Sequence, residues 1–178
     1  MFKKGFKIGF IIGAILAVSG IGYVYYVSKT SIEKSQKISK VKNFNDINIP
    51  IMDLDGKTID LRNYGDKTIL INIWGTWCAP CVKEMPLLQE TYNQLKEEYV
   101  FVMISDEDPQ KIKEFTKKNN YDFEFVQTEK NLKSIIGVFP TTFILDREGN
   151  IVYHNVGSFE DYSKTDLLEL LTKKRITN

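Results

Sequence analysis

The sequence predicts an α/β domain in which helices cover both faces of a mixed β-sheet, preceded by a single membrane-spanning helix. Two predominantly apolar runs, residues 69–74 and 99–104, are typical of strands that are buried on both faces of a sheet. Helical patterns alternate with these strands, and a strand–turn–strand unit follows near the end of the domain. Close to the start of the chain, residues 8–27 carry no charge.

Periodicity and turn residues place the elements of the domain. An N-terminal hairpin is expected from strands at 47–54 and 58–61, because Asp55-Gly56 between them favours a tight turn. Asp106-Glu107-Asp108 are expected to cap the helix that begins at Pro109. In chain order, the remaining elements are expected to be strand 69–74, helix 78–98 kinked at Pro86, strand 99–104, helix 109–119, strand 122–127, helix 130–136, strands 141–145 and 151–156, and helix 161–173.

Residues Ile8–Val27 are expected to form an uncleaved membrane anchor, because twenty residues of helix span roughly the 30 Å hydrocarbon core of a bilayer. Tyr23, Tyr25 and Tyr26 lie at the far end of this segment, where membrane helices carry interfacial aromatic residues. The alternative is a signal peptide cleaved after the small residues Ala17-Val18-Ser19, but the apolar run continues past that point. No cysteine lies near this segment to carry a lipid.

The chain therefore divides into an anchor (residues 1–27), a polar, lysine-rich tether (residues 28–45) and one domain (residues 46–174) that is long enough for its own core. Lysines lie on both sides of the anchor, so the positive-inside rule selects no orientation. A net charge of +1 gives no indication of a nucleic-acid partner.

The only two cysteines of the chain lie in Trp77-Cys78-Ala79-Pro80-Cys81, between a strand and the start of a helix. A helix N-terminus favours a thiolate, so the pKa of Cys78 is expected to be lowered, and Cys81 lies one turn further on to resolve a mixed disulfide. The alternatives are a structural disulfide, half of a zinc site, or two core thiols. Zinc normally takes four ligands, and the only histidine is His154. A disulfide in so short a loop adds little stability, and the pattern therefore indicates redox chemistry without a metal or another cofactor.

Three segments carry a family resemblance: residues 73–81, Glu84-Met85-Pro86 and residues 139–146, which read Phe-Pro-Thr-Thr-Phe-Ile-Leu-Asp. Together they resemble the thioredoxin superfamily, and within it the membrane-anchored TlpA and ResA type of thiol-disulfide oxidoreductase. The resemblance covers about residues 46–172. The W-C-x-x-C motif combined with the downstream F-P-T-T-F is specific, whereas either motif alone would be weaker.

The resemblance implies a thioredoxin-like fold and roles for individual residues. Cys78 would be the nucleophile and Cys81 the resolving thiol, while Trp77 and Phe139-Pro140, with Pro140 in the cis-proline position, would contact the substrate. Asn72 stands where cytosolic thioredoxin has a buried aspartate. Glu84 is then the nearest acidic candidate for proton transfer, although an exposed helical glutamate is its more ordinary interpretation.

The expected function is that of a reductase in the cytoplasmic membrane, with its catalytic domain on the extracytoplasmic side. The resemblance implies a CcdA- or DsbD-like membrane protein as electron donor, disulfides of client proteins as substrates, and apocytochrome c as one such client. A dithiol oxidase of the same fold and a copper-binding module that uses the two cysteines are the alternatives. A peroxiredoxin-type peroxidase fits less well, because a second cysteine and a tryptophan flank the thiol.

Overall fold

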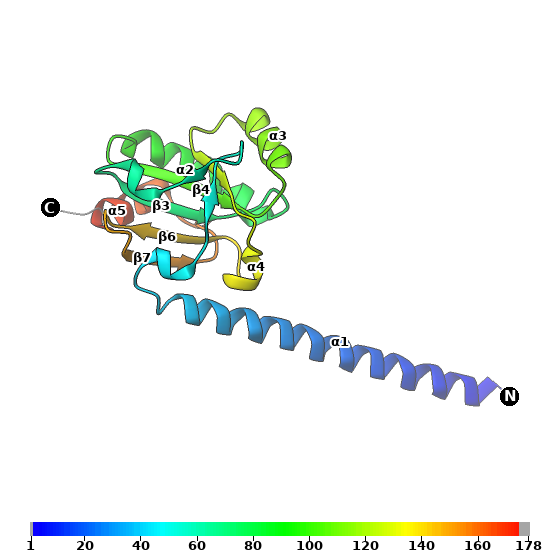
Figure 1. Cartoon of the computed structure of the whole chain (residues 1–178). Coiled ribbons are helices and arrows are strands. Elements are labelled where there is room, and N and C mark those ends of the chain that lie inside the picture. Colours follow the sequence, from blue (N-terminus) through cyan, green and yellow to red (C-terminus); the bar gives the residue numbers. More distant parts are fainter. Residues whose placement is uncertain (1, 175–178) are drawn as a thin grey trace.

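The computed structural model describes the backbone of residues 2–174 and the side chains of residues 16–174. Its centre is a mixed seven-stranded sheet with the strand order β2-β1-β5-β4-β3-β6-β7, and Figure 1 shows helices packed on both faces of this sheet. The strands are β1 Ile51–Met52, β2 Thr58–Ile59, β3 Thr68–Ile73, β4 Tyr99–Ser105, β5 Glu124–Gln127, β6 Thr141–Leu145 and β7 Ile151–Val156. The α-helices are α1 Phe2–Ile38, α2 Ala79–Leu95, α3 Pro109–Asn119, α4 Leu132–Ile135 and α5 Lys164–Lys174.

Strand β3 lies in the middle of the sheet and carries the redox motif at its C-terminal end. It pairs in parallel with β4 and antiparallel with β6, so Asn72 lies between Met103 on one side and Thr142 on the other. All six residues of β3 are buried, which explains why its sequence is apolar apart from Thr68 and Asn72. The predicted mixed α/β fold is therefore confirmed.

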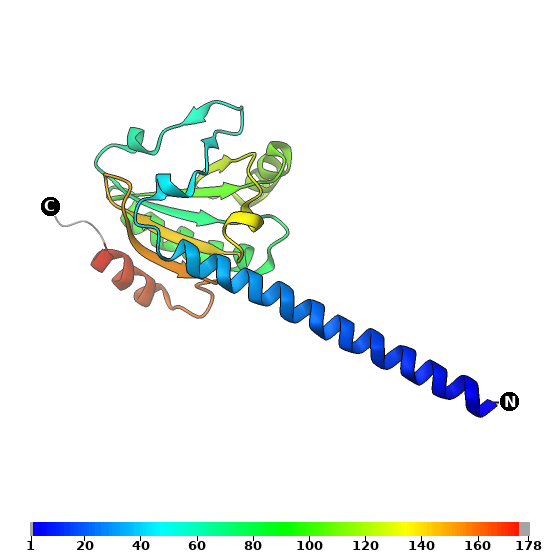
Figure 2. The ribbon, with the colours of Figure 1, turned by 60° about the horizontal axis from the view of Figure 1, so that its bottom comes forward.

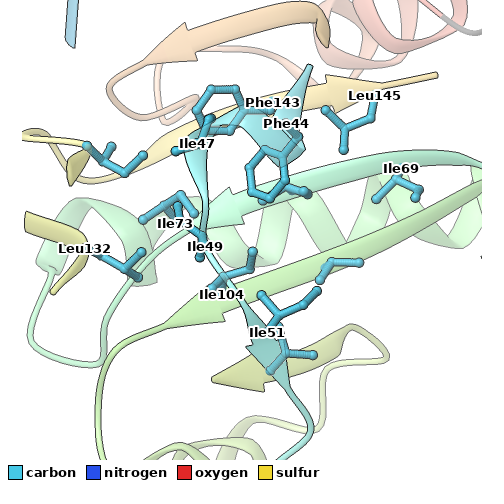
Figure 3. Packing of buried hydrophobic residues seen from close by; sticks show 14 of the residues in the cluster. Phe44, Ile47, Ile49, Ile51, Ile69, Ile73, Ile104, Leu132, Phe143 and Leu145 are labelled. Atoms are coloured by element: carbon cyan, nitrogen blue, oxygen red, sulfur yellow. The ribbon is translucent and has the colours of Figure 1, made fainter. Parts of the chain in front are cut away.

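The two faces of the sheet form two apolar cores, and alternate residues of each central strand enter one or the other. One core lies under α2, α3 and α5 and includes Leu70, Leu88 and Leu167. The other is covered by α4, a 3-10 helix at Phe44–Ile47 and the C-terminal end of α1. Figure 3 shows Phe44, Ile47 and Leu132 in this core. Helix α2, which bears the cysteines, is thus packed against the sheet.

The N-terminal hairpin is shorter than the sequence predicts. Its strands contain only two residues each, and Ile51 and Met52 of β1 pair with Ile59 and Thr58 of β2. The expected strand does not begin at residue 47, because a 3-10 helix ends there and the next residue, Asn48, has a left-handed backbone with φ 57°. An asparagine tolerates this conformation, and it turns the chain before β1.

Part of the segment expected to be a polar tether, residues 28–45, packs on the domain. Helix α1 continues to Ile38, which is buried in the core under α4. Phe44 is also buried and contacts the ring of Phe143 at a centroid distance of 5.6 Å. These two isolated apolar residues of the segment therefore belong to the core of the domain.

The N-terminal part of α1 projects away from the domain (Figures 1 and 2). In the part of the chain that the structure describes, no helix combines the length and apolar character that a membrane crossing needs. Residues 8–15 of the expected anchor lie outside the side chains that are described. Between Leu16 and Val27, the large apolar and aromatic side chains are exposed.

Candidate active site

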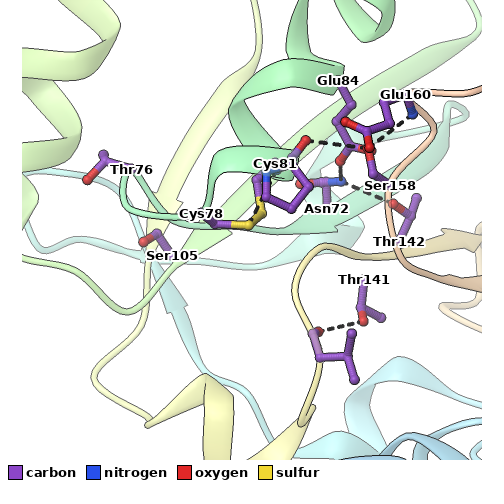
Figure 4. Close-up of a disulfide and its surroundings, with 12 residues drawn as sticks. Asn72, Thr76, Cys78, Cys81, Glu84, Ser105, Thr141, Thr142, Ser158 and Glu160 are labelled. Atoms are coloured by element: carbon purple, nitrogen blue, oxygen red, sulfur yellow. Dashed lines mark hydrogen bonds between the residues drawn. A yellow bond between two sulfur atoms is a disulfide. The ribbon is translucent and has the colours of Figure 1, made fainter.

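Cys78 and Cys81 form a disulfide at the start of α2 (Figure 4). Cys78 is the N-cap residue, and its Sγ accepts a hydrogen bond from the backbone N–H of Cys81 at 3.3 Å. A thiolate at this position would be stabilised by that N–H and by the positive end of the helix dipole. Cys81 is fully buried, whereas Cys78 keeps 4% of its surface exposed, so Cys78 offers the accessible sulfur.

The loop between β3 and Cys78 is shaped by a close contact between Gly75 and Trp77. A Cβ atom on Gly75 would lie 2.7 Å from Nε1 of the indole, so only glycine lets the ring fold back over this residue. The indole is nevertheless 57% exposed, and it contacts the ring of Phe139 at a centroid distance of 5.2 Å. Two aromatic rings from separate loops therefore form a rim beside the dithiol.

Glu107 holds the same loop from the other side. Its carboxylate accepts hydrogen bonds from the backbone N–H of Thr76 at 2.5 Å and from the Thr76 hydroxyl at 2.8 Å. Of the three acidic residues expected to cap α3, only Asp108 does so, by accepting from the N–H of Gln110. The position of Glu107 just after β4 could have predicted this contact from the sequence. Neighbouring parallel strands bring the loops at their C-terminal ends to the same edge of the sheet.

The peptide bond Phe139-Pro140 is cis, which is the geometry that the resemblance implies at this position. The adjacent β6 begins at Thr141, which pairs with Ile73 at the end of β3. This pairing, together with the contact between Phe139 and Trp77, brings the proline loop beside the redox motif.

Glu84 is fully buried, which corrects the expectation of an exposed helical residue. Its carboxylate accepts hydrogen bonds from Asn72 Nδ2 at 2.9 Å and from the backbone N–H of Phe159 at 2.8 Å. Asn72 also donates to the Thr142 hydroxyl at 3.1 Å. The asparagine therefore lies beneath the active-site helix and ties α2 to β3 and β6 (Figure 4).

Burial raises the pKa of Glu84, although the hydrogen bonds from Phe159 and Asn72 act in the opposite direction. Desolvation disfavours the charged carboxylate, and the negative charge of Glu160 adds to this effect. Glu84 consequently holds its proton to a higher pH than an ordinary glutamate. It lies one helical turn after Cys81, so a proton acceptor and donor is placed on the same side of α2 as the buried sulfur.

A dithiol at a helix N-terminus, a cis-proline loop beside it and a buried carboxyl group one turn further on define a thiol-disulfide oxidoreductase with the thioredoxin fold. Among the residues whose side chains are described, no three His, Cys, Asp or Glu side chains are placed to hold a metal ion. The two sulfurs exchange electrons with other disulfides through mixed-disulfide intermediates.

Comparisons with known proteins agree with this class. The model of the Redoxin family matches residues 36–171. A protein named thiol-disulfide oxidoreductase ResA from Bacillus cereus is 35% identical over 167 residues, which cover 89% of this chain and 91% of the relative. The protein of the same name from Bacillus subtilis is 27% identical and covers 88% of each chain. The chain therefore belongs to the Redoxin family and is similar to its ResA-type thiol-disulfide oxidoreductases, so the resemblance seen in the sequence is confirmed.

Solved structures share the fold. A thiol:disulfide interchange protein from Chlorobium tepidum has a TM-score of 0.58 and 23% identity, and the match covers 72% of this chain and 95% of that chain. StoA from Bacillus subtilis has a TM-score of 0.54 and 23% identity, with 68% and 94% covered. At this identity, the likeness concerns the fold alone.

Proposed function

We propose that this protein is a reductase of disulfides outside the cytoplasmic membrane and that α1 anchors it there. The observation that favours reduction of clients over their oxidation is the acidic surroundings of the dithiol. Glu84 is buried one turn after Cys81, and Glu107 binds the loop before Cys78. Negative charge opposes thiolate formation. A dithiol whose thiolate is less strongly stabilised gives up its electrons more readily, whereas strong oxidants of this fold stabilise their reduced form.

The reaction begins at Cys78, because its sulfur is the accessible one. The Cys78 thiolate attacks one sulfur of the client disulfide; that S–S bond breaks, a mixed disulfide forms, and the other client sulfur leaves as a thiolate. Cys81 then loses its proton and attacks Cys78 Sγ, which releases the second client thiolate and leaves Cys78–Cys81 oxidised. Two electrons pass to the client, and Glu84 is placed to accept the Cys81 proton.

The aromatic rim formed by Trp77 and Phe139 is the proposed docking site for the client. Trp77 is exposed beside an otherwise buried disulfide, so a client approaching Cys78 meets its indole. Pro140 belongs to the adjoining loop, where an extended client backbone would lie by resemblance to thioredoxins. Apocytochrome c before haem attachment is the proposed client, because its two cysteines must be reduced for that reaction.

The apolar character of residues 8–27 supports the anchor. In the described part of this segment, Leu16, Val18, Ile21 and Val24 are about two-thirds exposed or more, which is unfavourable in water and favourable in lipid. The redox motif that follows the segment favours an external domain and therefore a cytoplasmic N-terminus. Because that compartment is oxidising and has no glutathione buffer, electrons would cross the membrane through a CcdA- or DsbD-like protein.

A redox titration of the purified chain tests whether the protein reduces or oxidises its clients. We expect a reduction potential at or below that of thioredoxin, which is about −270 mV. A value near that of the oxidase DsbA, about −120 mV, would show that the protein is an oxidase instead.

Thiol labelling of intact protoplasts tests the location. A membrane-impermeant maleimide should label reduced Cys78 in intact cells, and the labelled protein should sediment with the membranes. Labelling only after lysis would place the domain inside the cell. Recovery of a soluble product that begins near Gly20 would instead identify a cleaved signal peptide.

A further inference from the structure

The last two turns of α1 lie on the domain through a single face. Ser31, Lys34 and Ser35 are partly buried, and Ile38 is buried, whereas the other residues between Ser31 and Ile38 are exposed. This spacing is that of one side of an α-helix. Ile38 packs in the same core as Leu132 of α4. The segment is therefore a docked helix end, which restricts how the domain can turn relative to α1.

The docked face leaves no room for a side chain at Gly137, in the loop that leads to the cis-proline. A Cβ atom on Gly137 would lie 2.8 Å from the backbone oxygen of Ser31 and 3.1 Å from Lys34 Cβ, and the residue has a φ of 88°. Any other residue here would displace α1 and strain the loop. Helix α1 thus packs directly on the loop whose Phe139 contacts Trp77.

The docked segment also has a direction relative to the active site. Ser31 lies beside Gly137, near the start of β6. Further along the chain, the carbonyl of Lys42 accepts a hydrogen bond from Ile151, beyond the turn at the other end of β6. The chain therefore runs from the redox end of the sheet to its opposite end. Traced backwards, α1 leaves the domain at the redox end, as Figures 1 and 2 show.

The length of helix between the domain and the proposed membrane interface is short. Tyr26 precedes Ser31 by five residues, which correspond to about 7.5 Å along a helix axis. The tyrosines at positions 23, 25 and 26 are the residues expected at the interface. The proline loop would then lie within about two helical turns of the lipid headgroups.

We propose that the docked end of α1 fixes the orientation of the domain, so that the dithiol faces the membrane and is presented to the membrane-embedded dithiol donor of the proposed function. This inference rests on the proposed anchoring. A thiolate of the partner attacks Cys78 Sγ, the Cys78–Cys81 bond breaks, and Cys81 leaves as a thiolate. The partner's second thiol then displaces Cys78, so the partner becomes oxidised and this protein gains two electrons.

A distance measurement in nanodiscs tests the orientation. Both native cysteines are replaced by serine, and a single spin-labelled cysteine is introduced by Ala79→Cys, within the motif, or by Glu169→Cys on α5; both native positions are exposed. Lipids that carry chelated Ni²⁺ should enhance the relaxation of the label at position 79 several-fold more than that at 169. Equal relaxation enhancement at positions 79 and 169, in protein that has entered the nanodiscs, would overturn the proposed orientation but not the anchoring. Failure of the chain to enter nanodiscs would overturn the anchoring and this inference with it.

A pair of isoleucine variants tests the consequence for electron transfer. Ile38→Ser removes the buried contact of α1, and Ile32→Ser is the matched control, because Ile32 is exposed on the same helix. In membranes that contain the reducing partner, we expect Ile38→Ser to slow re-reduction about tenfold, since undocking lowers the effective concentration of the dithiol at the partner. Ile32→Ser should leave this rate unchanged, and reduction by dithiothreitol should be the same in all three proteins. Equal re-reduction of both variants would overturn the proposal, while the nanodisc measurement stands independently of the stability of Ile38→Ser.

Discussion

The substitution Glu84→Gln tests how the buried carboxyl group controls the dithiol. In the native protein, Glu84 is enclosed by α2, β3 and the backbone of Phe159, and its pKa is raised by burial. A glutamine has nearly the same shape but carries no charge and takes up no proton. It therefore removes the electrostatic effect while leaving the packing of the helix in place.

The size of the electrostatic effect of Glu84 on the thiols follows from its position on the helix. Residues separated by three positions on a helix have Cβ atoms about 5–6 Å apart, and Cys81 and Glu84 are such a pair; about 6 Å is therefore taken as the separation of the two charges. At an effective dielectric constant of about 20, two unit charges about 6 Å apart interact by about 2.8 kcal/mol, which corresponds to about two pH units. Because the charged carboxylate opposes a second negative charge, its removal favours the thiolate.

The assay is the alkylation of the reduced protein by iodoacetamide as a function of pH. Iodoacetamide reaches Cys78, the accessible sulfur, so the value worked out for Cys81 is an upper bound, and we expect the pH midpoint of alkylation to fall by up to about two units in Glu84→Gln. The matched control is Glu90→Gln, because Glu90 is on the same helix but exposed. A midpoint that is unchanged or higher in Glu84→Gln would refute the electrostatic coupling between the carboxylate and the thiols.

Glu84→Gln should also change how the free energy of unfolding depends on pH. Because the pKa of Glu84 is higher in the folded state than its ordinary value of 4.5, the folded state binds the proton more tightly. The free energy of unfolding must then fall as the pH rises from about 4.5 through the raised pKa. Glu84→Gln should abolish this part of the pH dependence, as measured by urea unfolding of the oxidised protein. At low pH the variant should be less stable by about 1–3 kcal/mol, since its amide cannot accept both hydrogen bonds.

Three further substitutions test the site. Cys81→Ser should trap mixed disulfides with client proteins through Cys78, whereas Cys78→Ser should trap none; equal adducts on a non-reducing gel would refute the assigned roles. Asn72→Asp places a second carboxyl group at a position that lies 2.9 Å from Glu84, so the alkylation midpoint should rise; an unchanged midpoint would show that this position does not influence the thiols. Gly75→Ala should displace the neighbouring indole, which lies 2.7 Å from the added methyl group. We expect client reduction to slow several-fold while the urea midpoint changes little, and an unaltered client rate would exclude the aromatic rim as a docking site.

The sequence by itself determined the fold class and the redox pair, because both depend on local patterns. The apolar run at residues 69–74 predicts a strand buried on both faces wherever it lies in the sheet. The adjacent Cys-x-x-Cys at the start of a helix predicts a reactive dithiol from helix electrostatics alone. The later Phe-Pro-Thr-Thr-Phe motif adds the proline loop, and the structure places Pro140 in the cis form.

Only the tertiary structure decided the surroundings of that pair. Glu84 appears as one charged residue among many on a helix, and its burial depends on β3 and on Phe159, which is 75 residues away. Glu107 reaches Thr76 only because β3 and β4 are parallel neighbours. The polar segment before the domain has few apolar residues, so its docking depends on a glycine in a distant loop that leaves room for the helix. Such contacts between distant parts of the chain have no periodicity of their own, and the sequence therefore cannot reveal them.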